Sequence, residues 1–151
     1  MGESAPRGSL PNSSEETDLR FLDTTFLVDI LRNIPVAIEK LRGLEAAGPL
    51  VTTEVVAYEL YLGIQHIGRK RREAEAARIE ETLAQTDVLP FDRPSAIRAA
   101  ELSAELRRRG HTIGILDLLI ASTALAHGGE ALVTRDAADF QRVPGILVET
   151  Y

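Results

Sequence analysis

Residues 21–31 read FLDTTFLVDIL, and this stretch decides how the rest of the chain is interpreted. Phe21 and Leu22 are typical of the end of a short buried strand, and the apolar run after Thr25 is typical of a helix. Asp23 stands between them, where the strand ends. Open parallel sheets bind their ligands outside the carboxyl ends of their strands, so an acid in this place is a candidate functional residue.

The composition limits the possible classes of protein. The chain has 151 residues, 44% of them apolar, which suits one domain with its own core. Aromatic residues make up 5%, and tryptophan and cysteine are absent, so we expect an aliphatic core. The lack of cysteine excludes disulfides, thiolate metal sites and cysteine nucleophiles, and it is compatible with a reducing compartment.

No apolar run approaches the roughly 20 residues of a membrane span. Residues 1–18 lack the apolar region of a secretory signal, and we predict that they form a flexible N-terminal tail. The sequence therefore predicts a cytoplasmic protein that does not enter a membrane.

Short apolar segments alternate with helical ones along residues 19–151. Strands are predicted at 19–22, 50–52, 87–91, 130–134 and 146–150, with a turn region over 135–145. Helices are predicted at about 24–32, 35–47, 54–67, 69–86, 93–110 and 116–127. This order predicts a single α/β domain over residues 19–151, with a mainly parallel central sheet of about five short strands flanked by helices.

Four acids are expected to meet at one edge of this sheet. Asp23 and Asp136 follow strands, and at about 100° per residue Glu59 and Asp117 each fall in the middle of an apolar helix face. Each acid also has a structural explanation: the three aspartates could be helix N-caps, and Glu59 could pair with an arginine. Together, a cluster of carboxylates without cysteine predicts a hard-cation site for Mg²⁺ or Mn²⁺.

Three segments resemble the PIN domain, and within that family the VapC-type ribonuclease toxins of toxin–antitoxin pairs. They are FLDTTFLVDIL (21–31), VTTEVVAYELYLGI (51–64) and IGILDLLIASTALAHGGEALVTRDAADFQRVPGILVETY (113–151). The last is the most specific, because it fixes two acids, their spacing and a closing strand together. The resemblance covers about residues 21–151.

The resemblance implies an endoribonuclease that depends on Mg²⁺ or Mn²⁺, with catalytic and metal-binding roles for Asp23, Glu59, Asp117 and Asp136. It places Thr24 and Thr134 next to these acids as residues that orient them. Asp139 is a fifth acid for which a turn cap is the favoured interpretation. The resemblance also implies a homodimer, an RNA substrate and an antitoxin partner whose tail folds across the groove.

Two basic runs are candidate RNA contacts despite the net charge of −6. One contains Arg69, Lys70, Arg71 and Arg72, and the other contains Arg107, Arg108 and Arg109. The alternative is a pair of solvated helix ends, the second run complementing a C-terminal dipole. His66 and His111 are left out of the predicted site.

Other classes of protein remain as alternatives. A haloacid-dehalogenase-like phosphatase needs a second aspartate two residues after the first, where this chain has Thr25. Two further alternatives are a PIN nuclease that acts in RNA maturation and a PIN domain that only binds a partner. The presence of all four acids disfavours the second, non-catalytic alternative.

Overall fold

Five short parallel strands form the sheet at the centre of the computed structural model, which describes residues 19–151. The strands are β1 (Arg20–Leu22), β2 (Val51–Thr53), β3 (Asp87–Leu89), β4 (Ala131–Val133) and β5 (Leu147–Glu149), in the spatial order β3-β2-β1-β4-β5. The predicted sheet is therefore correct. The predicted tail, residues 1–18, lies outside the described residues.

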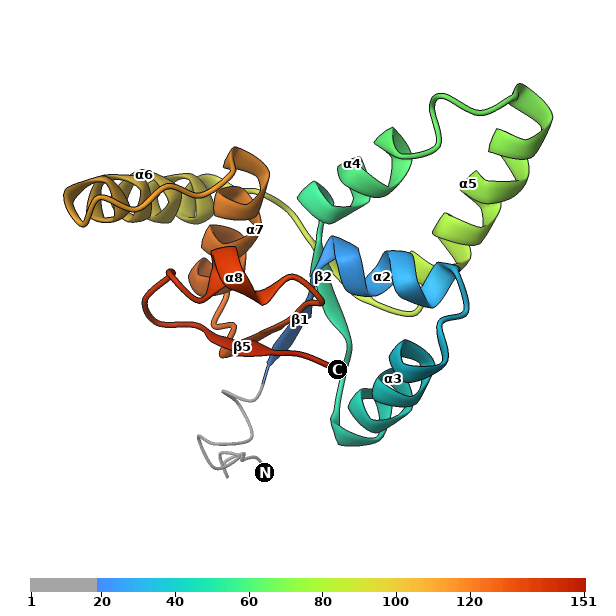
Figure 1. The fold of residues 1–151 in the computed structure, drawn as a ribbon, viewed down its shortest axis with the longest axis horizontal. Coiled ribbons are helices and arrows are strands. Elements are labelled where there is room, and N and C mark those ends of the chain that lie inside the picture. The colour runs from blue at the N-terminus through green and yellow to red at the C-terminus, as the bar shows by residue number, and fades with distance from the viewer. Residues whose placement is uncertain (1–18) are drawn as a thin grey trace, which may run out of the picture.

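The helices connect these strands in the alternating order that the sequence predicts. They are α2 (Thr24–Leu31), α3 (Pro35–Ala47), α4 (Glu54–Leu62), α5 (Arg69–Leu83), α6 (Arg93–Arg108), α7 (Ile115–Ala126) and α8 (Ala137–Phe140). In Figure 1, α2, α3 and α5 lie on one side of the strands, and α6 and α7 lie on the other. No helix within residues 19–151 has the length and apolar character needed to cross a membrane.

Local sequence chemistry explains where the helices begin. Asp23, Thr53 and Asp92 each occupy an N-cap and accept a backbone hydrogen bond on their side chains. Pro35 opens α3, because its missing N–H costs nothing in the first turn of a helix. The core beneath these helices is aliphatic apart from Phe21, Phe26 and Phe140, as the composition predicts.

The predicted elements differ most from the structure after α4 and after β4, and the helix expected over residues 69–86 ends earlier, at Leu83. The helix expected over residues 54–67 ends at Leu62, with Gly63 as its C-cap, and turns follow before α5. Side chains satisfy the carbonyls that this early end exposes: Gln65 donates to the carbonyl of Tyr61, and Arg72 donates to that of Ile67 at 3.2 Å. The expected turn region after β4 contains the one-turn helix α8.

The chain changes direction in the sheet at β1. From β1 it proceeds outward through β2 to the edge strand β3, and it then crosses to β4 on the other side of β1. The carboxyl ends of β1 and β4 therefore mark the topological switch point, the place where open α/β sheets bind ligands. The residues that directly follow these two strands are Asp23 and Thr134.

Candidate functional site

Asp23 lies at the topological switch point of the sheet and is held there by hydrogen bonds. Its backbone N–H donates to the carbonyl of Val133 at 3.0 Å, and its side chain is only 2% exposed. One oxygen of its carboxylate, Oδ2, accepts hydrogen bonds both from Thr25 Oγ1 at 2.9 Å and from Thr134 Oγ1 at 2.7 Å. Asp23 is thus both a helix cap, as the structural alternative proposes, and a carboxylate held by neutral donors at the site.

Thr25 was not among the predicted site residues. Its hydroxyl contacts Asp23, lies 3.0 Å from that of Thr134, and accepts a hydrogen bond from the Arg135 backbone at 3.0 Å. A signal for it existed, because a hydroxyl two residues after a capping aspartate is well placed to bond to that cap.

Glu59 approaches from α4. Thr24 Oγ1 donates to Glu59 Oε1 at 2.5 Å, so Thr24 lies beside a site acid, but a different one from the acid that precedes it in the sequence. The alternative of an arginine partner is wrong for the described residues, where no ion pair to Glu59 is present. Glu59 is half-buried.

Asp117 is the residue on which the acids converge. It is the third residue of α7, whose N-cap is Gly114, so the N-cap interpretation of Asp117 is wrong. Burial raises the pKa of Asp117 to about 7, and repulsion from the Asp23, Glu59, Asp139 and Asp136 carboxylates adds to the effect. All four acids therefore act on this half-buried side chain.

Asp136 and Asp139 both belong to the segment that forms α8. Asp136 occupies the N-cap position but makes no capping hydrogen bond with its side chain, and it is exposed. Asp139 lies inside the helix, so it is not the cap that the sequence favours, and it raises the pKa of Asp117 more than Asp136 does. Asp139 is therefore a stronger member of the cluster than its sequence suggests.

The donors at this site are suited to a hard cation. They are carboxylate and hydroxyl oxygens, without sulfur. Burial and, after it, the neighbouring carboxylates raise the pKa of Asp117, so its ionised form is unfavourable there and a bound cation would stabilise it. As the side chains stand, no three acidic or histidine residues within 19–151 are arranged to hold one metal ion. The chemistry of the residues fits Mg²⁺ or Mn²⁺, and binding would require the carboxylates to turn toward the ion.

One basic run borders the same groove as Glu59. A cavity of about 450 Å³ between α2, α4 and α5 is lined by Glu59, Arg32, Arg71 and Arg78 among others. His66 also lines it, whereas His111 is exposed in the loop before α7. Basic side chains therefore line a cavity that also contains Glu59.

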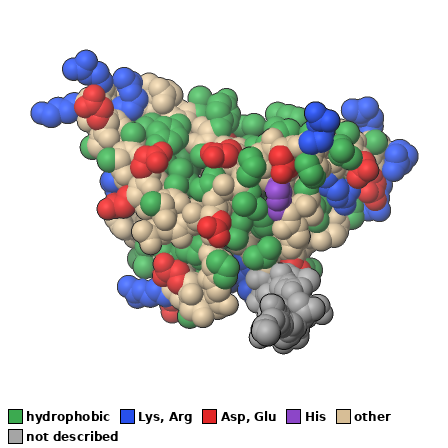
Figure 2. Space-filling view, turned by 180° about the vertical axis from the view of Figure 1, so that it is seen from behind, with side chains coloured by type: hydrophobic (Ala, Val, Ile, Leu, Met, Phe, Trp, Pro, Cys, Tyr) green, Lys and Arg blue, Asp and Glu red, His purple; other side chains and the backbone are tan. Residues whose placement is uncertain are grey.

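The second basic run lies elsewhere. Arg107 and Arg108 occupy the last turn of α6 and Arg109 pairs with Glu105 at 2.8 Å, which agrees with the dipole explanation. The ends of α5 and α6 that carry the runs lie at opposite ends of the long axis (Figure 1), and Lys and Arg side chains gather at both ends of the molecule (Figure 2).

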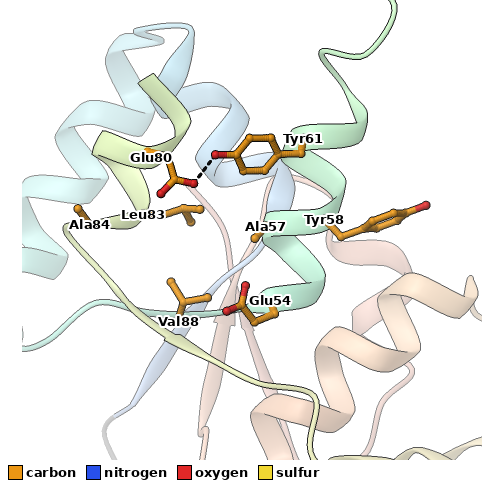
Figure 3. Close-up of a pocket in the computed structure, with 8 residues that line it drawn as sticks. All are labelled: Glu54, Ala57, Tyr58, Tyr61, Glu80, Leu83, Ala84 and Val88. Carbon is orange, nitrogen blue, oxygen red and sulfur yellow. Dashed lines mark hydrogen bonds between the residues drawn. The ribbon is translucent and has the colours of Figure 1, made fainter. Parts of the chain in front are cut away.

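A separate cavity of about 550 Å³ lies on the other side of α4 (Figure 3). It contains none of the site acids. Tyr61 donates a hydrogen bond to Glu80 across it, and this bond raises the pKa of Tyr61 to about 12. The contact ties α4 to α5 and so supports the helix that carries Glu59.

Comparison with known proteins identifies the family. The PIN domain family model matches residues 20–146, so the chain belongs to the PIN domain family. Curated relatives include the tRNA(fMet)-specific endonuclease VapC of Shigella flexneri, 29% identical over 130 residues that cover 86% of this chain and 96% of that protein. Ribonuclease VapC1 of Rickettsia felis is 31% identical over 104 residues, 68% of this chain and 77% of the relative.

Solved structures agree with these relatives. VapBC2 of Rickettsia felis, bound to a DNA fragment from its promoter, superposes with a TM-score of 0.80 at 25% identity, covering 88% of this chain and 98% of that one. DNA-bound VapBC of Salmonella typhimurium gives a TM-score of 0.78 at 28% identity, with the same coverage. The predicted PIN-like α/β fold and the resemblance to VapC proteins are confirmed.

Proposed function

We propose that this chain is an endoribonuclease that hydrolyses RNA phosphodiester bonds and acts in the cytoplasm as the toxin of a toxin–antitoxin pair. The observation that carries the proposal is the convergence of carboxylates on Asp117 at the switch point of a PIN-domain sheet. Relatives that match along nearly their whole length are named a tRNA(fMet)-specific endonuclease and a ribonuclease, which supports the same reaction.

Asp23, Glu59, Asp117 and Asp136 are the proposed ligands of Mg²⁺ or Mn²⁺, and Asp139 is a further candidate from α8. Bound there, the ion supplies Lewis-acid stabilisation of charge on the phosphate oxygens and lowers the pKa of water. The protein's own part is positional, because hydroxyl groups hold the Asp23 and Glu59 carboxylates in place.

The groove beside Glu59 is the proposed binding path for RNA. Arg71 and Arg32 line it, and Arg69 and Lys70 begin the same helix. Because Arg72 already holds the backbone carbonyls before α5, we assign it a structural role in addition. Single-stranded RNA follows positively charged grooves with affinities that depend strongly on salt.

Partners are proposed from the solved relatives, which are VapBC complexes. We propose that this chain forms a homodimer and binds a VapB-like antitoxin encoded next to it. An antitoxin segment that folds on binding would cover the acidic site and prevent RNA from entering.

The proposal can be tested by an RNA cleavage assay together with the growth of host cells that express the protein. Purified protein should cleave RNA in Mg²⁺ or Mn²⁺ and stop in EDTA, and Asp23→Asn and Asp117→Asn should each lower the rate by at least ~10²-fold. Asp87→Asn, at an exposed acid on the edge strand β3, is the matched control and should cleave normally. Expression of the wild type should arrest growth, and co-expression of the neighbouring reading frame should relieve the arrest. Full cleavage in EDTA, or by both site variants, would refute the proposal.

A further inference from the structure

Asp29 is a buried carboxylate that the proposed metal site does not use. It lies on α2, two turns from Asp23, and is 3% exposed. Both of its oxygens are occupied: Oδ1 accepts from Arg135 Nη1 at 2.6 Å, and Oδ2 accepts from Tyr151 OH at 2.6 Å. A buried charge with this many specific partners fixes the geometry of the segments that supply them.

The first of these segments carries the site. Arg135 stands between Thr134, which holds Asp23, and Asp136. The backbone N–H of Arg135 donates to Thr25 at 3.0 Å, and that of Asp136 donates to Thr134 Oγ1 at 3.0 Å. The segment from β4 to α8 is therefore hydrogen-bonded to α2 at two residues. The backbone of Arg135 bonds to Thr25, and its side chain bonds to Asp29.

The second segment is the end of the sequence after β5. The Tyr151 ring packs edge-on against Phe26, a buried residue of α2, with ring centroids 5.0 Å apart. Burial raises the pKa of the Tyr151 hydroxyl, with a further contribution from its bond to Asp29, so the phenol remains a donor at neutral pH. Tyr151 therefore occupies one oxygen of the Asp29 carboxylate, and Arg135 is the cationic partner at the other oxygen.

We propose that Asp29, acting through Arg135 and supported by Tyr151, is a positioning residue for the acids of α8. The proposal rests on the proposed metal-dependent function. The Asp136 side chain makes no capping hydrogen bond, and Asp139 follows it in the same short helix, so the backbone of the β4–α8 segment sets the place of both carboxylates. Within that segment, Arg135 is the residue whose side chain bonds to Asp29 on α2.

An alternative role for Arg135 predicts different experimental results. Its side chain is 53% exposed, so it could contact RNA phosphates directly, with Asp29 as an incidental partner. In that case Arg135 would affect RNA affinity and its salt dependence, and Tyr151 would have no effect on the reaction. In the positioning role, all three residues affect metal affinity and turnover in the same direction.

The experiment uses Asp29→Asn, Arg135→Met, their double variant and Tyr151→Phe in the full chain. Tyr151→Phe removes one hydroxyl and keeps the ring on Phe26, so it reports on the carboxylate even if Asp29→Asn folds poorly. Tyr58→Phe, at an exposed tyrosine on α4, is the matched control. The measurements are kcat and KM for RNA, the Mn²⁺ concentration at the midpoint of the thermal shift, and backbone hydrogen exchange of residues 134–140 without metal.

We expect Asp29→Asn and Arg135→Met each to raise the Mn²⁺ midpoint about 10-fold and to lower kcat about 10-fold. Changes of this size are typical when a residue that supports the metal ligands is removed. KM should stay within about twofold, and the double variant should be no worse than the worse single variant, because both changes break one pair. Tyr151→Phe should shift the midpoint in the same direction by less. Exchange of residues 134–140 should become faster in all four variants and stay unchanged in Tyr58→Phe.

Two results would overturn the positioning role. One is an Asp29→Asn variant that matches the wild type in the Mn²⁺ midpoint and in hydrogen exchange. The other is an effect confined to Arg135→Met and expressed in KM and salt dependence, which would make Arg135 an RNA contact. A wild type that neither cleaves RNA nor responds to Mn²⁺ would overturn the proposed function itself, a result distinct from both.

Discussion

The charge state of Asp117 gives the sharpest prediction. In the metal-free protein, burial and the neighbouring carboxylates raise its pKa from 3.8 to about 7, so the folded state holds this proton more tightly than the unfolded state does. By linkage, stability then falls as the pH rises from about 4 to about 7 and is constant with respect to this group above that range. Asp117→Asn removes the charge and should remove this part of the pH dependence.

The magnitude follows from the two pKa values. Their difference corresponds to about 4 kcal/mol for a fully buried charge, at about 1.36 kcal/mol per pH unit. Asp117 is only half-buried, so water screens much of this energy, and we expect about 1–2 kcal/mol. At pH 8 without metal, Asp117→Asn should therefore melt about 3–6 °C above the wild type, and at pH 5 the two should nearly coincide.

Paired thermal melts at pH 5 and pH 8, in EDTA and in Mn²⁺, measure this. Mn²⁺ at a hundredfold excess over its dissociation constant should stabilise the wild type by ~2.7 kcal/mol, and it should stabilise the variant less. Asp87→Asn again serves as the control and should follow the wild type throughout. A variant that melts below the wild type at pH 8 in EDTA, with no Mn²⁺ effect on the wild type, would refute the convergence of carboxylates.

Three further predictions test other parts of the molecule. Replacing Arg69, Lys70 and Arg71 by glutamine should reduce the log–log salt slope of RNA binding by ~0.7 per lost phosphate contact, while the same change at residues 107–109 should leave it unaltered. Thr24→Val should lower kcat by about 10-fold in a cleavage assay and change the free energy of unfolding by less than ~1 kcal/mol in urea, since it frees Glu59. Gly129→Ala should destabilise by about 1–3 kcal/mol, because its new Cβ would lie 2.7 Å from the Phe21 ring, whereas Gly43→Ala, with nothing within 4 Å, should stabilise slightly in the same urea titration.

Local patterns in the sequence were sufficient to predict the strands and every described helix except the short α8, and they drew attention to the acids that act on Asp117. Short apolar runs bounded by caps, glycine and proline identified all five strands, and the position of Asp117 on an apolar face drew attention to its burial. The order of the strands could not be derived, since it depends on pairing between segments far apart in the chain. The same helix-face test would have drawn attention to Asp29, three residues after the buried Phe26, but its partners Arg135 and Tyr151 become visible only in three dimensions.

The partners of the acids separate two kinds of carboxylate in this fold. Asp23 and Glu59 are held by threonine hydroxyls, which orient an anion and leave its charge in place. Asp29 is held by an arginine, which neutralises it and occupies one of its oxygens. A carboxylate paired with a guanidinium forms an ion pair without net charge, whereas the hydroxyls that hold Asp23 and Glu59 are neutral and bond to one oxygen of each carboxylate. The choice of donor beside each acid therefore supports the proposal that Asp23 and Glu59 bind the cation and that Asp29 supports the segment that carries Asp136 and Asp139.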